Sequence, residues 1–252
     1  MRKSIEITVC LMLFLAAACS SERRNSNGDL LPTFEEYTVS SVEDGSCSVN
    51  IRYQRIANTD SSDVLKRIDA MNYAHTFDEF ALYPADVEES VRLLVAEYAT
   101  NCADGEECDC LGCSYSLDQQ VFLGRNDSVL CYETCVETYS GGAHGGDALL
   151  YDCYDLATGG LYDFSYLIDG EWAAAVQALI YDRLNEVCDD VLFVASPESV
   201  YIPRSVKITE NGLLLVYQPY EVASFDAGII SVELTDEELL YCGAPLVWVD
   251  CE

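Results

Sequence analysis

Three stretches of the chain repeat apolar residues at helical spacing, which predicts three helices with one buried face each. They span residues 61–74, about 85–100 after Pro84, and 170–187, and Asp60 is expected to cap the first. The apolar positions are Val64, Leu65, Ile68 and Met71 in the first helix, Val87, Val91, Leu94, Val95 and Tyr98 in the second, and Trp172, Val176, Leu179, Ile180, Leu184 and Val187 in the third.

Alternation of apolar and polar residues predicts the strands. They are expected at residues 47–56, 114–123, 129–139, 147–156, 204–210, 213–219 and 228–234. Turn sequences at 124–128 and at Asn211-Gly212 join neighbouring strands as hairpins, and 235–240 starts a short helix with a capping box. Because strands and helices do not alternate, the fold class is α+β, with antiparallel sheets joined by hairpins and helices packed on one side.

The N-terminus reads as an export signal. Residues 1–19 have a positive start, an apolar run too short to span a bilayer comfortably, and small residues before Cys19. This is typical of a lipoprotein signal peptide in which Cys19 carries the lipid; the alternative is plain secretion with cleavage after Ala18. We therefore expect an exported, lipid-anchored protein of the cell envelope, in the periplasm or at the cell surface. The polar residues 20–35 read as a tether, so the membrane is reached through the anchor alone.

A cysteine-rich loop at 101–113 suggests a division of the rest of the chain. Residues 36–112 would form an N-terminal α+β companion region, and residues 113–252 a C-terminal α+β domain.

The charge is strongly acidic. The chain has 13 Lys and Arg against 44 Asp and Glu, a net charge of −31, and removal of residues 1–18 leaves 11 and 43, a net charge of −32. Half of the residues are hydrophobic, so the acids decorate a folded surface rather than a disordered tail. Such a surface repels nucleic acid and attracts cationic partners. Acidity that serves solubility alone is the alternative.

Cysteine is abundant. Eleven cysteines remain beyond Cys19, and in an exported chain they favour disulfides, with at least one left over. The candidates are Cys102, Cys108, Cys110 and Cys113 in the loop, and Cys131, Cys135 and Cys153 in the strands that follow. The alternative is that the four cysteines of the loop bind zinc or an iron–sulfur cluster. The loop lacks the two C-x2-C motifs that such sites usually pair, which argues against this alternative. Its acids Asp104, Glu106, Glu107 and Asp109 lack the ladder of a calcium loop. We expect no metal and no cofactor.

The stretch Y-S-G-G-A-H-G-G at 139–146 is the candidate binding loop, with Tyr139, Gly141, Gly142 and His144 as its residues. Its glycines indicate a backbone that takes positive φ or passes close to another group. His144 is expected to shape the loop through ring hydrogen bonds; contact with a ligand and catalysis are the alternatives. Neither a G-x-S-x-G elbow nor an H-E-x-x-H motif is present, so no catalytic residue is assigned.

Three blocks of sequence resemble the RsiV-like family of exported domains, which includes the ectodomain of a lysozyme-sensing anti-sigma factor and an accessory region of a peptidoglycan deacetylase. They are Tyr139 to Gly145, Tyr154 to Gly159, and the run Tyr220-Glu221-Val222-Ala223, Phe225, Gly228, Val232-Glu233-Leu234 and Glu238-Leu239. The resemblance covers about 115–240, with a weaker match to the companion region around Ile68 to Asn72.

The resemblance implies an exported α+β scaffold and binding of lysozyme or a similar basic protein. The leading hypothesis is a lipid-anchored envelope protein that binds a cationic protein or a cell-wall glycan and is not an enzyme. The alternatives are a hydrolase or deacetylase of envelope polysaccharide that uses His144, and a structural surface lipoprotein.

Overall fold

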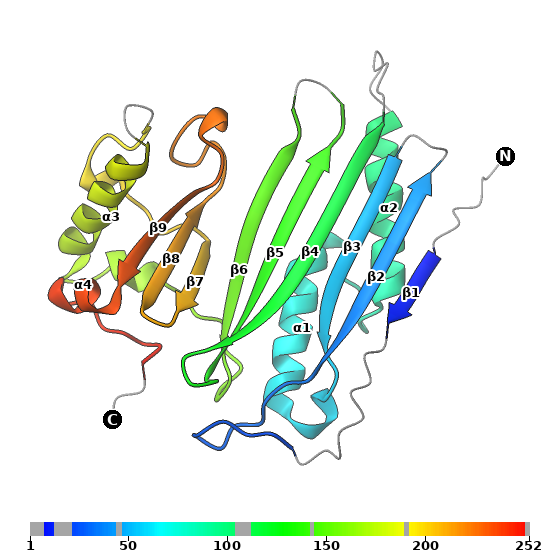
Figure 1. Ribbon diagram of the computed structural model, residues 1–252, viewed down its shortest axis with the longest axis horizontal. Coiled ribbons are helices and arrows are strands. Elements are labelled where there is room, and N and C mark those ends of the chain that lie inside the picture. The colour runs from blue at the N-terminus through cyan, green and yellow to red at the C-terminus, as the bar shows by residue number, and fades with distance from the viewer. Residues whose placement is uncertain are drawn as a thin grey trace. The chain divides into compact units, whose positions relative to one another are not determined.

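The computed structural model describes residues 8–12, 22–43, 47–103, 112–141, 144–188 and 192–249. It is mixed α+β, as the sequence predicts, with one sheet in the order β1-β2-β3-β4-β5-β6 and a second in the order β7-β8-β9 (Figure 1). Two compact units divide the chain. Unit 1 comprises residues 1–23, 30–120 and 134–147, and unit 2 comprises 24–29, 121–133 and 148–252. The two units are defined by how compactly their residues pack and each contains several separate stretches of the chain. The predicted domain boundary between residues 112 and 113 therefore remains a prediction.

The first sheet contains a parallel pair that the sequence pattern does not reveal. Its strands are β1 (Thr8–Met12), β2 (Phe34–Glu43), β3 (Cys47–Ile56), β4 (Cys113–Gly124), β5 (Val129–Tyr139) and β6 (Gly146–Asp155). β1, β2 and β3 pair antiparallel, whereas β3 pairs parallel with β4 from Cys47 opposite Cys113 to Arg52 opposite Asp118. A parallel pair needs a long crossover, and two helices supply it. The sequence predicted antiparallel sheets, and the β3–β4 pair is an exception to that prediction.

The segment before β3 is folded where the structure describes it. β2 was not among the predicted strands, and Leu30 and Leu31 of the predicted tether are buried. β1 lies within the predicted signal peptide and pairs with β2. Cys19 lies outside the described residues, and the signal peptide and the lipid anchor stay predictions.

Helices α1 (Asp63–Phe77) and α2 (Val87–Ala103) form the crossover and cover one face of the unit 1 sheet (Figure 1). The core contains apolar side chains of both helices and of the three strands beneath them, namely Val39, Val49, Ile51, Tyr53, Tyr73, Phe77, Val87, Val91, Leu94, Val95 and Leu117. Ser62, not Asp60, caps α1, since its hydroxyl accepts a hydrogen bond from the Leu65 amide. Because the chain makes one short 3-10 turn over Thr59–Ser61, α1 begins two residues later than predicted.

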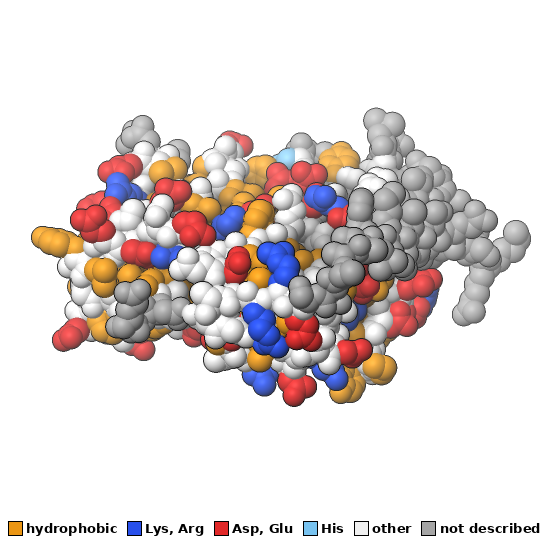
Figure 2. All heavy atoms as spheres, turned by 60° about the horizontal axis from the view of Figure 1, so that its bottom comes forward, with side chains coloured by type: hydrophobic (Ala, Val, Ile, Leu, Met, Phe, Trp, Pro, Cys, Tyr) orange, Lys and Arg blue, Asp and Glu red, His pale blue; other side chains and the backbone are white. Residues whose placement is uncertain are grey.

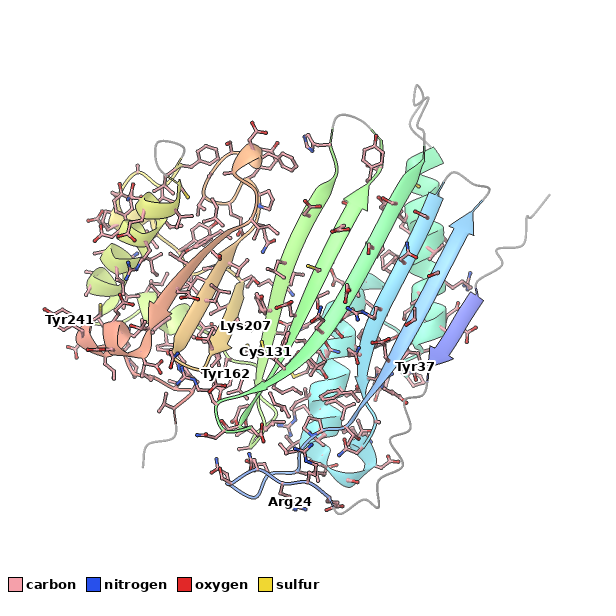
Figure 3. The ribbon with its side chains drawn as sticks, viewed as in Figure 1. Arg24, Tyr37, Cys131, Tyr162, Lys207 and Tyr241 are labelled. Carbon is pink, nitrogen blue, oxygen red and sulfur yellow. The ribbon has the colours of Figure 1, made fainter. Side chains whose placement is uncertain are left out.

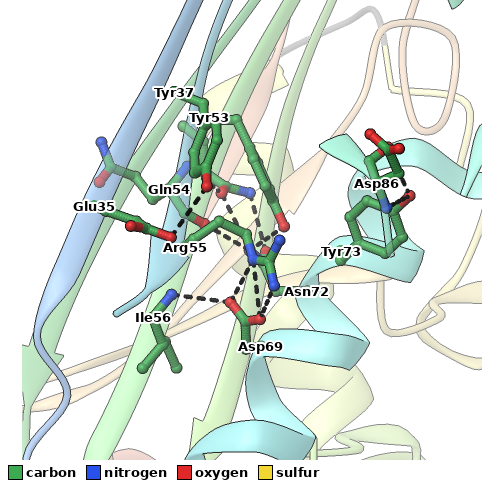
Figure 4. A network of polar contacts seen from close by, with 11 residues as sticks. Glu35, Tyr37, Tyr53, Gln54, Arg55, Ile56, Asp69, Asn72, Tyr73 and Asp86 are labelled. Carbon is green, nitrogen blue, oxygen red and sulfur yellow. Dashed lines mark hydrogen bonds and ion pairs between the residues drawn. The ribbon is translucent and has the colours of Figure 1, made fainter. Parts of the chain in front are cut away.

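A polar network lies on the buried face of α1 (Figure 4). The Asp69 carboxylate accepts two hydrogen bonds of 2.9 Å from Arg55 Nε and one of 2.9 Å from the Ile56 amide. Burial lowers the pKa of Arg55, but the hydrogen bond and the charge of Asp69 outweigh it and leave that pKa above its ordinary value. Farther along α1, the side chain of Asn72 exchanges two hydrogen bonds with the side chain of Gln119 of β4. The sheet and the helix are thus joined by polar contacts as well as by apolar packing.

Unit 2 is built on β7 (Ser205–Thr209), β8 (Gly212–Tyr217) and β9 (Ile230–Thr235), which pair antiparallel. The predicted turn at Asn211-Gly212 joins β7 to β8. Helix α3 (Ala173–Cys188) packs on this sheet through Val176, Ile180 and Leu184, which are all fully buried. A short helix, α4 (Asp236–Tyr241), follows β9.

The capping box predicted at the start of α4 is confirmed. The Thr235 hydroxyl accepts a hydrogen bond from the Glu238 amide, and the Glu238 carboxylate accepts one of 2.9 Å from the Thr235 amide. That backbone hydrogen bond is the main cause that holds the pKa of Glu238 below its ordinary value of 4.5, and Arg183 adds to it.

We expect the stability of unit 2 to fall as pH drops below about 4.5, in part through Glu238. A carboxyl whose pKa is lowered on folding stabilises the fold above its unfolded pKa and loses that contribution as pH falls through its folded pKa. Because the side chain is 30% exposed, the effect is small, about 0.5 kcal/mol. Urea unfolding of the wild type and of Glu238→Gln at pH 7 and pH 3.5 measures it. Equal pH dependence in both proteins would contradict the assignment.

Candidate binding sites

The Y-S-G-G-A-H-G-G loop joins β5 to β6, and its glycines have two different structural reasons. Gly141 has a φ of 95°, in the left-handed region. At Gly145 a Cβ would lie 2.4 Å from the Thr138 carbonyl oxygen, so only a glycine fits beside β5. The two alternatives that the sequence left open, positive φ and close approach, are both present, at different positions.

His144 is exposed on this loop, and its Nδ1 lies 3.0 Å from the Gly145 carbonyl oxygen. Since a carbonyl only accepts, this contact requires the proton on Nδ1. Tyr139 is 36% exposed at the end of β5, and Gly142 lies outside the described residues. The expectation that His144 shapes the loop stays a prediction, as does a ligand role of the loop.

The predicted cysteines fall into two groups. Cys108 and Cys110 lie outside the described residues, as do the acids Asp104, Glu106, Glu107 and Asp109, and the side chain of Cys102 in α2 is not described. Cys113 begins β4 and is in a disulfide. Cys131 and Cys135 lie on β5 and Cys153 on β6, and the Sγ atoms of Cys131 and Cys153 are 2.7 Å apart. Among the described residues no group of three His, Cys, Asp or Glu side chains is arranged to hold a metal ion.

Sequence reasoning missed a pocket in unit 1. It has a volume of about 310 Å³ and opens where α1 ends, beside α2 and β4. We call it the aromatic–acidic pocket. Its lining residues are Thr76, Phe77, Asp78, Glu79, Phe80, Leu94, Glu97, Tyr98 and Tyr115, and no described lining residue is Lys or Arg.

The chain turns sharply at the mouth of this pocket. α1 ends at Phe77, and Asp78 then takes φ 44° and ψ −116°, a conformation that few non-glycine residues adopt. The 3-10 turn η2 (Asp78–Phe80) follows, so two exposed carboxylates and the half-buried Phe80 ring come together at one edge. Glu97 on α2 supplies a third carboxylate to the lining. A backbone strained in this way costs free energy, about 1–3 kcal/mol.

Two tyrosines form the inner wall of the aromatic–acidic pocket. The Tyr98 and Tyr115 rings meet edge to face with centroids 5.5 Å apart, and the Tyr98 hydroxyl donates to the Ser114 carbonyl at 2.9 Å. Burial, and to a lesser extent the neighbouring Tyr98, raises the pKa of Tyr115 to about 12, so its ring stays neutral at physiological pH. Aromatic faces carry negative charge density, which together with nearby carboxylates favours a cation.

The first part of the third block of the resemblance, residues 220–228, forms a loop in unit 2, and the rest lies in β9 and α4. Tyr220 has a φ of 72°, is 62% exposed, and lies 5.5 Å from Phe225 between ring centroids. The Phe193 amide donates to the Val222 carbonyl at 2.7 Å and ties this loop to residues 192–193. Exposed aromatic rings therefore occur in unit 2 as well.

A signal for the aromatic–acidic pocket does exist in the sequence, in the run T-F-D-E-F at 76–80, where two acids stand between two aromatic residues at a helix end. The other wall comes from residues 94–98 and from Tyr115, which only the crossover brings into place. No helix in the described part of the chain has the length and apolar character needed to cross a bilayer.

Comparison with known proteins identifies a family segment. Residues 174–237 match the model of a protein family of unknown function, DUF3298. The match runs from α3 to the start of α4, and it includes the Tyr220 loop but not the loop around His144. No curated protein matches the chain.

Two solved structures have the same fold. A DUF3298 family protein from Bacteroides fragilis is similar with a TM-score of 0.68 and 16% identity, over 83% of this chain and 92% of that chain. A DUF3298 family protein from Pseudomonas aeruginosa is similar with a TM-score of 0.52 and 16% identity, over 84% and 94%. This chain therefore contains a segment that matches the DUF3298 family, at residues 174–237, and shares its fold with solved members of that family.

Proposed function

We propose that this protein is an exported, lipid-anchored binding protein of the cell envelope that captures a cationic partner. The partner is a basic protein such as lysozyme, and a lysine or arginine side chain of that partner enters the aromatic–acidic pocket. The observation that carries the proposal is the pocket itself, in which aromatic walls and three carboxylates surround about 310 Å³.

The charge of the whole chain supports the same partner. Carboxylates are spread over the face seen in Figure 2, with fewer Lys and Arg side chains between them, in keeping with the net charge of −31. A negative field accelerates the encounter with a basic protein. Salt weakens this field, and at physiological ionic strength charges more than about 8 Å apart are largely screened from each other. The negative field alone does not determine where on the surface the basic partner binds, whereas the aromatic–acidic pocket provides one defined binding site.

The two contributions differ in what they add to affinity. An exposed charge contributes mainly to the association rate, whereas a cation held against an aromatic ring gains about 0.5–2 kcal/mol. Phe80 and Tyr98 are half-buried in the pocket lining, so they are positioned to provide this second contribution.

We expect lysozyme to bind at low salt and to lose at least about tenfold in affinity between 50 and 300 mM NaCl. Phe80→Ala and Glu97→Gln are each expected to weaken binding about fivefold at fixed salt. Titration calorimetry at both salt concentrations measures these changes. The matched control is Asp182→Asn, which removes one exposed carboxylate of α3 in unit 2 and should change affinity less than twofold.

The outcomes separate the parts of the proposal. Absence of binding at low salt contradicts the basic partner. Binding that Glu97→Gln and Asp182→Asn weaken equally contradicts the pocket, since the surface charge alone then accounts for the affinity.

A further inference from the structure

The sulfur atoms of Cys131 and Cys153 are adjacent inside unit 2. Their Sγ atoms are 2.7 Å apart, and the two residues are 3% and 2% exposed. A disulfide bond is about 2.05 Å long, so a small rotation of the side chains closes the remaining distance. Figure 3 labels Cys131 on β5, with Lys207 of β7 nearby.

The backbone has the geometry that a cross-strand disulfide needs. The Leu156 amide donates a hydrogen bond to the Ser128 carbonyl at 3.0 Å, so these two residues lie opposite each other at the end of the antiparallel hairpin. Cys131 is three residues after Ser128, and Cys153 is three residues before Leu156. The two cysteines therefore also lie opposite each other. Hydrogen-bonded pairs alternate along such a ladder, so the cysteine pair is a non-hydrogen-bonded one, with Cα atoms about 4.5 Å apart. That separation falls within the range of about 4.4–6.8 Å found in disulfides.

A second contact confirms this position in the ladder. The Cys153 carbonyl accepts a hydrogen bond of 2.9 Å from the Tyr162 amide, on the side away from β5. The next pair of the same kind, Glu133 and Tyr151, also meets side chain to side chain, with the tyrosine hydroxyl donating to the carboxylate at 2.7 Å. The two strands thus present facing side chains at successive non-hydrogen-bonded positions.

We propose that Cys131 and Cys153 form a cross-strand disulfide that links β5 to β6 within unit 2. The bond forms by exchange with a small disulfide oxidant such as oxidised glutathione. The Cys131 thiolate attacks one sulfur of the oxidant and releases one thiol, and the Cys153 thiolate then displaces the second. Two protons and two electrons pass to the oxidant, which leaves as two thiols.

Both sulfur atoms are buried in the folded protein, so an oxidant should reach them more readily before the strands are fully packed. The hydrogen bond with Cys153 is the main cause that raises the pKa of the Cys131 thiol, and burial raises it further. Little thiolate therefore exists in the folded protein at neutral pH. We therefore expect the folded, reduced protein to react with oxidised glutathione at least about tenfold more slowly than the protein in urea.

Peptide mapping tests the bond directly. The full chain is refolded with glutathione redox buffer, free thiols are alkylated in denaturant, and the digest is analysed by mass spectrometry without and with reduction. We expect one linked peptide pair that contains Cys131 and Cys153, two hydrogens lighter than the separate thiols. Alkylation of both cysteines before reduction, or linkage of either to another cysteine, overturns the proposal.

Thermal unfolding gives an independent readout. Reductant is expected to lower the Tm of the wild type by about 5 °C more than it lowers the Tm of Cys131→Ala/Cys153→Ala. The control is Cys188→Ala, which removes a buried thiol of α3 and should leave the effect of reductant as in the wild type. An equal effect of reductant on wild type and double variant counts against the bond, and the peptide map decides the matter if the double variant does not fold.

Discussion

Replacing Asp69 by alanine is expected to lower the free energy of unfolding by about 3–5 kcal/mol. The Asp69 side chain is only 5% exposed, and the Arg55 side chain that it neutralises is 21% exposed. Removal of the carboxylate leaves a partly buried guanidinium without this partner and the Ile56 amide without its acceptor. Native domains have only about 5–15 kcal/mol of stability, so the loss is a large fraction of the total.

Urea unfolding followed by circular dichroism measures the loss, with Asp182→Ala as the matched control. Asp182 is exposed on α3, and its replacement should cost less than about 0.5 kcal/mol. A double variant, Arg55→Met/Asp69→Leu, should be more stable than Asp69→Ala, because it removes both charges and keeps the volume apolar. A loss in Asp69→Ala no larger than in the control would show that the pair does not hold α1 on the sheet.

The same network connects to the aromatic–acidic pocket. The Gln119 amide donates to the Thr76 hydroxyl at 3.1 Å, and Thr76 lines the pocket at the end of α1. Phe77, the next residue, meets Tyr53 of β3 edge to face at 5.0 Å. The end of α1, and hence the turn at Asp78, is therefore fixed by contacts that begin in the sheet.

The sequence predicted the regular elements of the chain well where the local pattern decides them. The strand at 129–139 and the Asn211-Gly212 hairpin were placed correctly because side-chain alternation and turn chemistry are local properties. The parallel pairing of β3 with β4 was missed, because the alternation of apolar and polar residues identifies a strand but not the strand with which it pairs. β2 was missed because polar residues fill most of its positions.

The buried face of α1 shows a different limit. Leu65 and Ile68 were predicted to be buried and are, but the same face also buries Asp69 and Asn72. A polar residue on a buried face is stable only when its partners are present, and those partners come from β3 and β4, Arg55 and Gln119 among them. Apolar periodicity alone therefore predicts the helix but not its contacts.

The candidate sites divide in the same way. The close approach at Gly145 and the positive φ at Gly141 were predictable as alternatives, because glycine has few other uses in such a loop. The aromatic–acidic pocket was not predictable, because its lining comes from residues 76–80, residues 94–98 and Tyr115, which meet only through the crossover.

Replacing Gly212 by alanine is expected to destabilise unit 2 by about 3 kcal/mol. Gly212 has a φ of 159°, and a Cβ there would lie 2.0 Å from the Leu234 carbonyl oxygen. The atoms that this Cβ would meet, in Leu234 and Thr235, belong to the β9 backbone, so no side-chain rotation relieves the clash. The two strands would have to separate, although Leu213 and Leu234 are directly paired and both buried.

Gly228 provides the matched control for this prediction. It has a φ of 68°, and a Cβ there would meet nothing within 4 Å, so Gly228→Ala carries only the strain of a left-handed alanine, about 1–2 kcal/mol. Urea unfolding of the two variants therefore separates backbone strain from steric clash, because the difference between them reports the contact with β9. If Gly212→Ala unfolds with the same free energy as Gly228→Ala, the strands move apart at little cost, and the β8–β9 ladder is not the rigid element of unit 2.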